Sequence, residues 1–511
     1  MIIQNTLLPD WLTRCAENQP HHLALKYEQS AWSFAHLDRQ VTQLARQLAM
    51  AGIQEGSRVA LLAANGLSYV TCVHALTRLG AILVPLNVRL TTEELCWQVG
   101  DVRAALLVCD EGYTAQASAI CAAIPSLPLA TLAAESRQGE TVLSELSEAD
   151  VSLHTLIDLS ATQAILYTSG TTGHPKGTII TYGMQWWNAI GSALNLGHRS
   201  DDCWLACLPF FHIGGLSILM RSVIYGISVV VQKKFDARAV NRSVVEDRVS
   251  IISVVAAMLQ RMLTALDADG NRAHYPETLR CVLLGGGPAP QPLLEECARR
   301  ALPVVQTYGL TEACSQAVTL APEDALRKLG SAGRPLAPVQ LRILRNLQPV
   351  GAHEEGEIFL CGPTITPGYA GNPEATLRAF HDGWFATGDI GYLDEEGYLY
   401  VLDRRADLII SGGENVYPAE IESVLLAHPA VAEAGVCGRD DVQWGQVPVA
   451  FVRLHPSSRV HVQDLIEYVA QRLARYKQPK TIYVVDRLPR NASGKLLRRD
   501  LPGWDRNSPP E

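Results

Sequence analysis

The stretch Tyr167–Gly177 has a composition that suits the phosphate groups of a nucleotide. Its glycines let the backbone curl so that consecutive N–H groups can point at an anion, its hydroxyl side chains add donors, and Lys176 adds a positive charge. The stretch follows an apolar, strand-like run, Ala164–Leu166, but no Gly-Lys-Ser/Thr closes it, so it is not a Walker loop. We therefore predict a phosphate-binding loop made by Thr168, Ser169, Gly170, Thr171, Thr172, Gly173 and Lys176.

Four further stretches combine turns with single charged side chains and follow the loop in this order: Tyr308–Glu312, Thr387–Asp389, Asp403–Asn415 and Pro489–Lys495. With the loop, they resemble the ordered motifs of the adenylate-forming superfamily, which includes acyl- and aryl-CoA ligases, luciferases and peptide-synthetase adenylation domains. Five motifs in the expected order, covering nearly the whole chain, are far more specific than one. Within the superfamily the chain most resembles the o-succinylbenzoate–CoA ligases of menaquinone biosynthesis, through Leu208–Leu216, Leu284–Pro290 and Gln306–Gln316.

The resemblance implies an AMP-forming acid–thiol ligase that uses ATP, Mg²⁺ and coenzyme A. Such an enzyme activates a carboxylic acid as an acyl-adenylate, and fixed cations and N–H donors stabilise the charge that develops on the phosphoryl oxygens. The resemblance places Glu312 at the Mg²⁺, which suits a hard cation shared between a carboxylate and phosphate oxygens. It assigns catalysis to Lys495, His212, Thr311 and Glu312, and nucleotide binding to Gly285, Gly286, Gly287, Tyr308, Gly309, Thr311, Asp389 and Arg404.

The acid is expected beside His212, because the matching residue walls the acid pocket in relatives. Relatives that take amino acids tend to place an Asp near here, and residues 209–219 contain none, so an amino-acid substrate is disfavoured. o-Succinylbenzoate carries a second carboxylate, which an apolar pocket would penalise strongly unless it were paired. Arg221 is the only charged residue in the helix-like segment after His212. Along a helix at ~1.5 Å per residue it would lie roughly 13 Å from His212. Its guanidinium can pair with a carboxylate through two parallel hydrogen bonds. Alternatively, Arg221 lies on the solvated side of that helix, and Ser217 and Thr311 supply the donors.

The second half-reaction requires the thiol of CoA to reach the acyl carbonyl, beside which Lys495 stands during adenylation. In the superfamily the C-terminal domain rotates about a hinge and presents another face, which here would carry Gly412 and Gly413. We accordingly predict an N-terminal domain over residues 1–403, a hinge over 404–406, a C-terminal lid over 407–500 and a disordered tail over 501–511. Ala406 departs from the Asp or Lys common at the hinge, so a polar contact made there in relatives would be missing.

The elements that position these residues follow an α/β pattern. Strand-like runs at 58–64 and 81–84 flank a helical pattern at Leu67–Leu79, and the rhythm recurs at 279–284, 292–301 and 304–307, which predicts parallel-rich sheets covered by helices. After about residue 335, short strands with glycine-rich turns predict a small β-rich subdomain. From residue 406 the pattern is α+β, with helices at Pro418–Leu426 and His461–Tyr476 and strands at Val431–Val436, Val447–Leu454 and Thr481–Val485.

Composition excludes several classes of protein. The 511-residue chain has 48% hydrophobic and 19% charged residues, and its net charge of −9 leaves no basic stripe for nucleic acid. Its 12 cysteines include no Cys-x-x-Cys pair, which disfavours metal clusters. The N-terminus lacks a secretory pattern, and polar residues interrupt the longest apolar stretch, Val249–Leu266. We expect a cytoplasmic protein without a stable membrane anchor, and leave a homo-oligomer open.

Two other functions stay open at this point. A stand-alone adenylation domain would share the first half-reaction but load a carrier protein, and a ligase of this kind could take another aryl or acyl acid. A non-catalytic binding module is disfavoured, because Lys176, Glu312, Asp389 and Lys495 are all present. An assay of AMP and thioester formation with ATP, free CoA and a panel of acids would separate these functions.

Overall fold

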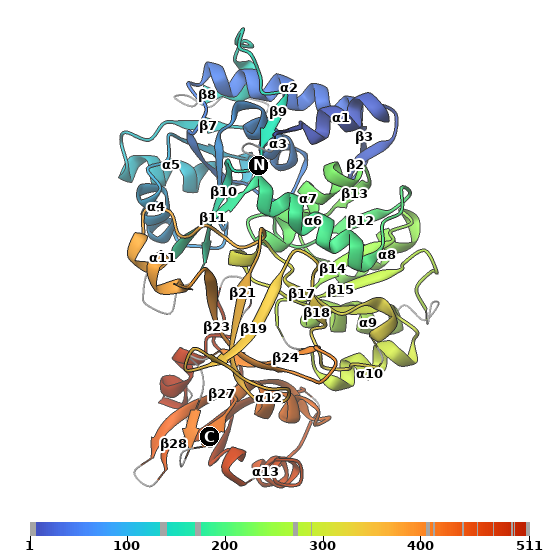
Figure 1. Ribbon diagram of the computed structural model, residues 1–511, viewed down its shortest axis with the longest axis vertical. Coiled ribbons are helices and arrows are strands. Elements are labelled where there is room, and N and C mark those ends of the chain that lie inside the picture. Colours follow the sequence, from blue (N-terminus) through green and yellow to red (C-terminus); the bar gives the residue numbers. More distant parts are fainter. Residues whose placement is uncertain are drawn as a thin grey trace.

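The computed structural model describes residues 7–132, 141–168, 175–268, 274–287, 289–325, 327–404, 409–411, 414–441, 444–456, 458–473, 475–491, 494 and 496–506. Figure 1 shows three parts along the longest axis. A large α/β part occupies one end, antiparallel strands drawn in yellow and orange occupy the middle, and a smaller C-terminal unit occupies the other end. The predicted α/β fold with a β-rich subdomain and an α+β C-terminal unit is confirmed.

The first sheet has seven strands in the order β11-β10-β5-β4-β6-β7-β8. Neighbours are parallel except β10 and β11, which form an antiparallel hairpin. Helix α3 keeps its predicted bounds and ends at Gly80, which adopts the left-handed backbone (φ 63°) that stops helices. The elements are β4 (Arg58–Leu62), β5 (Ile82–Pro85), β6 (Leu106–Cys109), β7 (Leu129–Thr131), β8 (Thr141–Val142), β10 (Thr162–Thr168) and β11 (Lys176–Thr181), with α2 (Phe34–Met50), α3 (Leu67–Leu79), α4 (Thr92–Asp101) and α5 (Thr114–Ala123).

The second sheet has nine strands in the order β18-β17-β16-β15-β14-β12-β13-β2-β3, and it is parallel from β16 to β2. Its central strands are buried on both faces, which is why they read as continuous apolar runs. The elements are β2 (Leu23–Tyr27), β3 (Ser30–Ser33), β12 (Cys203–Ala206), β13 (Ser228–Val231), β14 (Ile251–Val254), β15 (Cys281–Leu284), β16 (Val304–Tyr308), β17 (Val318–Thr319) and β18 (Arg334–Pro335), with α6 (Tyr182–Leu196), α7 (Ile213–Tyr225), α8 (Ala237–Glu246), α9 (Ala256–Ala268) and α10 (Gln291–Arg299).

The third sheet is antiparallel and joins the α/β part to the C-terminal unit. It consists of β19 (Gln340–Arg345), β20 (Gln348–Pro349), β21 (Gly356–Cys361), β22 (Phe380–His381), β23 (Trp384–Leu393) and β24 (Leu399–Arg404), with helix α11 (Pro373–Ala379). Strand β24 ends where the hinge is predicted. Residues 405 and 406 lie outside the described residues, so the hinge stays a prediction.

The C-terminal unit has its own five-stranded sheet and its own buried core. It contains β25 (Ile409–Ser411), β26 (Glu414–Val416), β27 (Val431–Asp441), β28 (Gly445–Leu454) and β29 (Thr481–Val484), with α12 (Pro418–Leu426) and α13 (Val462–Ala470). The helix predicted over His461–Tyr476 is too long, because the chain must turn back to pair β29 with β28. The disordered tail is also wrong for residues 501–506, which belong to the 3₁₀ helix η7 (Arg498–Arg506), where Leu501 is fully buried and Trp504 donates to the carbonyl of Arg487.

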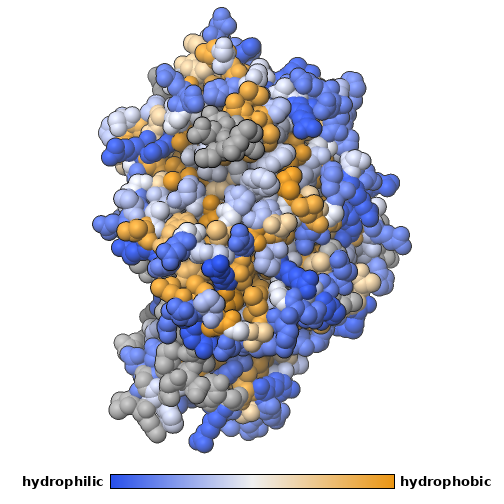
Figure 2. Space-filling view, in the orientation of Figure 1, coloured by the Kyte–Doolittle hydropathy of each residue, from blue (hydrophilic) through white to orange (hydrophobic). Residues whose placement is uncertain are grey.

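The remaining elements close the N-terminal end. Strand β1 (Leu7–Pro9) pairs with β9 (Leu156–Asp158), and α1 (Trp11–Asn18) packs on α2. No helix in the described part of the chain is long and apolar enough to cross a membrane. Figure 2 shows a mostly hydrophilic rim, with hydrophobic side chains gathered along the middle of the face, over the antiparallel sheet.

Candidate functional site

The predicted phosphate loop connects the two strands of an antiparallel hairpin. Strand β10 ends at Thr168, β11 begins at Lys176, and these two residues pair with each other. Ser169, Gly170, Thr171, Thr172 and Gly173 lie outside the described residues, so their phosphate contacts stay predictions. The ends of the hairpin nevertheless fix where the loop begins and returns, and both Thr168 and Lys176 line a large cavity.

The Thr311–Glu312 pair follows β16, at the carboxyl edge of the parallel sheet where ligands of such folds bind. Gly309 is required here, because a Cβ on it would stand 1.5 Å from the carbonyl oxygen of Ser315. Two residues after Glu312, Cys314 adopts the left-handed backbone at φ 55°, which is uncommon for a residue with a side chain. The loop that carries Glu312 is therefore tightly folded upon itself.

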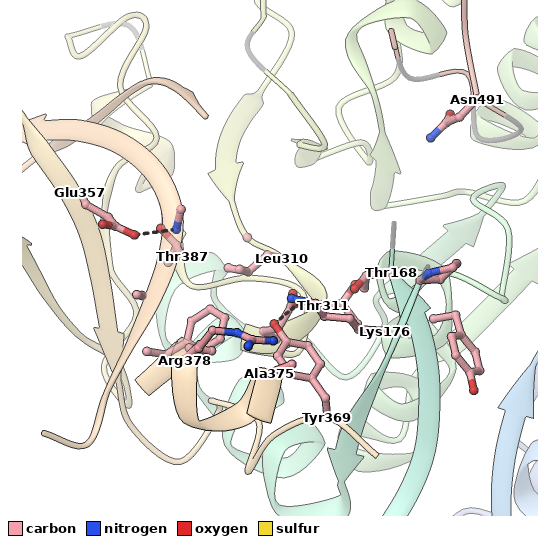
Figure 3. A pocket seen from close by; sticks show the side chains of 18 of the residues that line it. Thr168, Lys176, Leu310, Thr311, Glu357, Tyr369, Ala375, Arg378, Thr387 and Asn491 are labelled. Carbon is pink, nitrogen blue, oxygen red and sulfur yellow. Dashed lines mark hydrogen bonds between the residues drawn. The ribbon is translucent and has the colours of Figure 1, made fainter. Parts of the chain in front are cut away.

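Tyr369 fixes the Glu312 side chain. Its hydroxyl donates to Glu312 Oε1 at 3.1 Å, and burial together with the Glu312 charge raises the pKa of Tyr369, so the phenol keeps its proton at neutral pH. The Lys176 ammonium lies over the same ring, 5.1 Å from its centroid. Figure 3 shows Lys176, Thr311 and Tyr369 converging from three different elements.

The other predicted nucleotide residues lie after β15, at the end of β16 and on β23, and they are not among the described residues that line the cavity. Gly285, Gly286 and Gly287 follow β15, whose last residue, Leu284, pairs with Gln306 of β16, two residues before that strand ends. Tyr308 donates to Asp389 Oδ2 at 2.7 Å, and Asp389 is 7% exposed. This bond ties the predicted adenine and ribose motifs together across 81 residues of sequence. The backbone of Arg404 pairs with Asp389, but the Arg404 side chain is outside the description.

A cavity of about 1980 Å³ lies where the three parts of the chain meet. Of the predicted residues, Thr168, Lys176, His212, Gly309, Thr311 and Glu312 line it. The C-terminal unit contributes Tyr417, Arg490, Asn491, Leu497 and Arg499, and Figure 3 shows Asn491 apart from the other labelled side chains, on a different segment. Lys495, Gly412 and Gly413 lie outside the described residues, although Asn491 and Leu497, which flank Lys495 in sequence, line the cavity.

His212 lies at the start of α7 and faces the cavity. Its Nε2 is buried, and no described residue hydrogen-bonds to it. Burial, and to a lesser extent the positive charge of Arg89, lowers the pKa of His212 to about 4. The imidazole is therefore neutral at physiological pH, in a residue that lines the cavity.

Ser217 and Arg221 lie deeper in the protein, on α7, and do not line the cavity. The alternative that Arg221 faces solvent is wrong, because Arg221 is 2% exposed: α7 is enclosed by protein on nearly every side. Arg221 Nη2 donates to Asn188 Oδ1 at 2.5 Å, and its guanidinium lies 5.4 Å from the Trp204 ring. Its Nε has no hydrogen-bond partner among the described residues, and burial lowers the pKa of Arg221.

Several residues that line the cavity were missed from the sequence. Tyr369 follows a Pro-Gly turn, and this turn was a local signal that could have drawn attention to it. Glu357 accepts from the backbone N–H of Gly388 at 3.1 Å, beside the ribose motif, and Arg378 projects from α11 (Figure 3). Glu357 and Arg378 have no distinctive neighbours in sequence, because their proximity to the site comes from how β21, β23 and α11 fold together.

The residues present suit a magnesium ion that is shared with a nucleotide. In the described ranges, no group of three or more His, Cys, Asp or Glu side chains could hold a metal by itself. Glu312 nevertheless places one carboxylate in the cavity beside Lys176 and Thr311. One or two carboxylates plus substrate phosphates form the usual protein environment of Mg²⁺.

Two family models match the chain. The AMP-binding enzyme model matches residues 12–370, and the AMP-binding enzyme C-terminal domain model matches residues 420–495. The first match covers both α/β sheets and most of the cavity's described lining. The second falls within the C-terminal unit.

Known proteins resemble the chain over nearly its full length. It is 52% identical to the 2-succinylbenzoate–CoA ligase of Geobacillus kaustophilus, over 97% of this chain and 98% of that protein. The o-succinylbenzoate CoA synthetase of Bacillus subtilis in complex with its acyl-adenylate intermediate matches with a TM-score of 0.90 and 44% identity, covering 97% and 98% of the two chains. A double mutant of that synthetase bound with a product analogue has the same identity and coverage but a TM-score of 0.74.

Proposed function

The chain belongs to the AMP-binding enzyme family, and we propose that it is an AMP-forming ligase that joins 2-succinylbenzoate to coenzyme A. In the first step, a carboxylate of the acid attacks the α-phosphate of ATP and displaces pyrophosphate. In the second, the thiol of CoA attacks the acyl carbonyl and displaces AMP. The enzyme uses ATP, Mg²⁺ and CoA.

The observation that carries this proposal is the cavity in which Thr168 and Lys176 from the ends of the predicted phosphate loop, the predicted metal ligand Glu312 and the predicted acid-pocket residue His212 meet. Lys176 supplies a positive charge for the phosphates, and Glu312 would hold Mg²⁺. The metal, when bound, would neutralise charge on the phosphates that leave as pyrophosphate. Tyr308 and Asp389 orient the adenosine, which fixes the α-phosphate relative to an acid lying beside His212.

The C-terminal unit supports adenylate formation in the orientation described. The backbone N–H of Leu497 donates to the carbonyl of Pro489 at 2.9 Å, and Arg490 donates to the carbonyl of Gly494 at 2.7 Å, so described residues on both sides of Lys495 in sequence are held together, and Arg490 and Leu497 line the cavity. The better match to the adenylate complex than to the product-analogue complex agrees with this orientation. Thioester formation would follow rotation of the lid, which brings Gly412 and Gly413 to the site. The expected cytoplasmic location and the oligomeric state stay predictions.

For the second carboxylate of the acid, we propose a receptor at Arg221. Arg221 and Ser217 both border the buried thiol of Cys314, and Asn188 joins Arg221 to the backbone carbonyl of Gln316. The amide nitrogen of the Gln316 side chain is also buried and lacks a partner among the described residues. Among the described residues this buried guanidinium contacts an amide and an indole ring and no carboxylate, so a substrate carboxylate would stabilise it. The succinylbenzoyl group would have to reach past His212 to arrive there.

Arg221→Met tests this receptor, because it removes the charge while keeping much of the volume. The measurement is kcat/KM for 2-succinylbenzoate and for the analogue that lacks the ring carboxylate, with thermal unfolding as a check on folding. The ratio of kcat/KM for 2-succinylbenzoate to kcat/KM for the analogue should fall about 10- to 100-fold, which is the effect of losing a hydrogen bond to a charged group. An unchanged ratio would remove Arg221 from the site. Wild-type enzyme that formed no AMP and thioester from 2-succinylbenzoate, ATP and free CoA would refute the proposed function itself.

A further inference from the structure

Tyr369 belongs to a short segment, residues 366–370, that lies against the edge of β11. The backbone N–H of Ile179 donates to the carbonyl of Gly368 at 3.1 Å, and that of Ala370 donates to the carbonyl of Gly177 at 2.8 Å. The backbone N–H of Tyr369 donates to the Thr376 hydroxyl at 3.0 Å. The position of the Tyr369 backbone is therefore fixed relative to the strand that begins at Lys176.

The same segment also donates two hydrogen bonds to Glu312. The backbone N–H of Thr366 donates to the Glu312 carbonyl at 2.7 Å, and the Tyr369 hydroxyl donates to Glu312 Oε1 at 3.1 Å. The Thr366 hydroxyl continues the connection, since it donates to the carbonyl of Ile179 on β11 at 2.7 Å. Both the backbone and the carboxylate of Glu312 are thus tied to the strand that follows the phosphate loop.

The Tyr369 side chain contacts two opposite charges at different places. Its hydroxyl holds the Glu312 carboxylate, whereas its ring face holds the Lys176 ammonium at 5.1 Å, a cation–π distance. Long side chains such as Glu and Lys lose rotamer freedom when they bind a ligand. A side chain that orders them beforehand reduces this loss.

We propose that Tyr369 is a positioning residue for magnesium–triphosphate binding. It sets the Glu312 carboxylate for the metal and the Lys176 ammonium for the phosphates before the nucleotide arrives. The inference rests on the proposed use of Mg²⁺ and ATP, but not on the identity of the acid. The proposed role predicts that Tyr369 affects the binding of ATP but not of AMP, because AMP lacks the phosphates that the metal and Lys176 would contact.

The test compares Tyr369→Phe with Tyr398→Phe in the full-length protein. Tyr398 is a matched control: it is 2% exposed, donates to a carboxylate, Asp324, and has the Lys328 ammonium over its ring, yet it does not line the cavity. Calorimetry measures ATP binding over a range of Mg²⁺ concentrations, and AMP binding without Mg²⁺. Thermal unfolding shows whether each variant folds.

Tyr369→Phe should raise the Mg²⁺ concentration needed for half-maximal ATP affinity about tenfold, as expected for one hydrogen bond to a charged group, and leave AMP affinity within about twofold. Tyr398→Phe should change neither quantity. Tyr369→Leu, which also removes the ring, should weaken ATP binding further even at saturating Mg²⁺. The proposal is overturned if Tyr369→Phe keeps the wild-type Mg²⁺ dependence, or if it weakens AMP and ATP equally. Either result would leave acid activation and thioester formation, and hence the proposed function, untouched.

Discussion

The neutral state of His212 gives a prediction that can be measured without any substrate. His212 faces the cavity, and burial with the nearby Arg89 lowers its pKa from 6.5 to about 4. At pH 6, a histidine with a pKa of about 4 is roughly 1% protonated, whereas an unperturbed one is roughly three-quarters protonated. We expect His212 to stay neutral throughout the range in which the enzyme would work.

The lowered pKa has a consequence for stability. Protonating folded His212 should cost about 3 kcal/mol more than protonating it in the unfolded chain, at about 1.36 kcal/mol per pKa unit. Because the unfolded chain binds more protons between pH 4 and 6.5, stability falls as the pH drops through this window. Above pH 6.5 the penalty is absent, and below pH 4 it is fully present. His212→Gln removes it.

The assay follows the imidazole signals of the histidines as the pH changes and measures unfolding of the protein in urea. The chain has 14 histidines, so the imidazole signal of His212 is assigned by its loss in His212→Gln and then followed from pH 7.5 to pH 4. Urea unfolding at pH 7 and at pH 4.5 should show that wild type loses more stability than His212→Gln. His74→Gln is the matched control, because burial also lowers the pKa of His74 to about 4, but His74 lies in α3, away from the cavity.

Both variants should therefore reduce acid sensitivity, and only His212→Gln should impair acid activation at pH 7. A His212 signal that titrates near pH 6.5 would refute the account of its burial. So would a His212→Gln variant with the same acid sensitivity as wild type. If His74→Gln also impaired acid activation at pH 7 while unfolding in urea like wild type, lining the cavity would not be what distinguishes His212 from His74.

Two further predictions concern the nucleotide and the lid. Tyr308→Phe removes the hydroxyl that holds Asp389, so AMP and ATP affinity measured by calorimetry should both fall about tenfold; unchanged affinities would exclude a role for this pair in ribose binding. Lys495→Ala should slow adenylate formation, followed as pyrophosphate release, by orders of magnitude and nearly spare thioester formation from preformed acyl-adenylate, whereas Gly413→Leu should do the reverse. Equal slowing of both half-reactions by Lys495→Ala would contradict the rotation of the lid.

Local sequence was sufficient wherever the physical cause is local. The bounds of α3 and α12 were predicted correctly, because Gly80 ends one helix in a left-handed conformation and Pro418 begins the other at a position where proline is favoured. The phosphate loop indicated by the glycines and hydroxyls of Tyr167–Gly177 stays a prediction, although the strand expected before it forms. Helix α13 was predicted too long, because its end is set by pairing between β28 and β29 and not by a residue inside the helix.

The sequence by itself determined which chemical groups the protein has and in what order they occur, and from them we predicted a phosphate loop, a carboxylate for Mg²⁺, a ribose aspartate and a catalytic lysine near the end. Only the tertiary structure decided which groups meet. Glu312 and Tyr369 are 57 residues apart, and Tyr308 and Asp389 are 81 apart, and no local pattern joins them. The structure also decided that Arg221 is buried and that His212 is neutral. Burial and electrostatic surroundings depend on segments packed together across the whole chain, whereas motifs depend on neighbours in sequence.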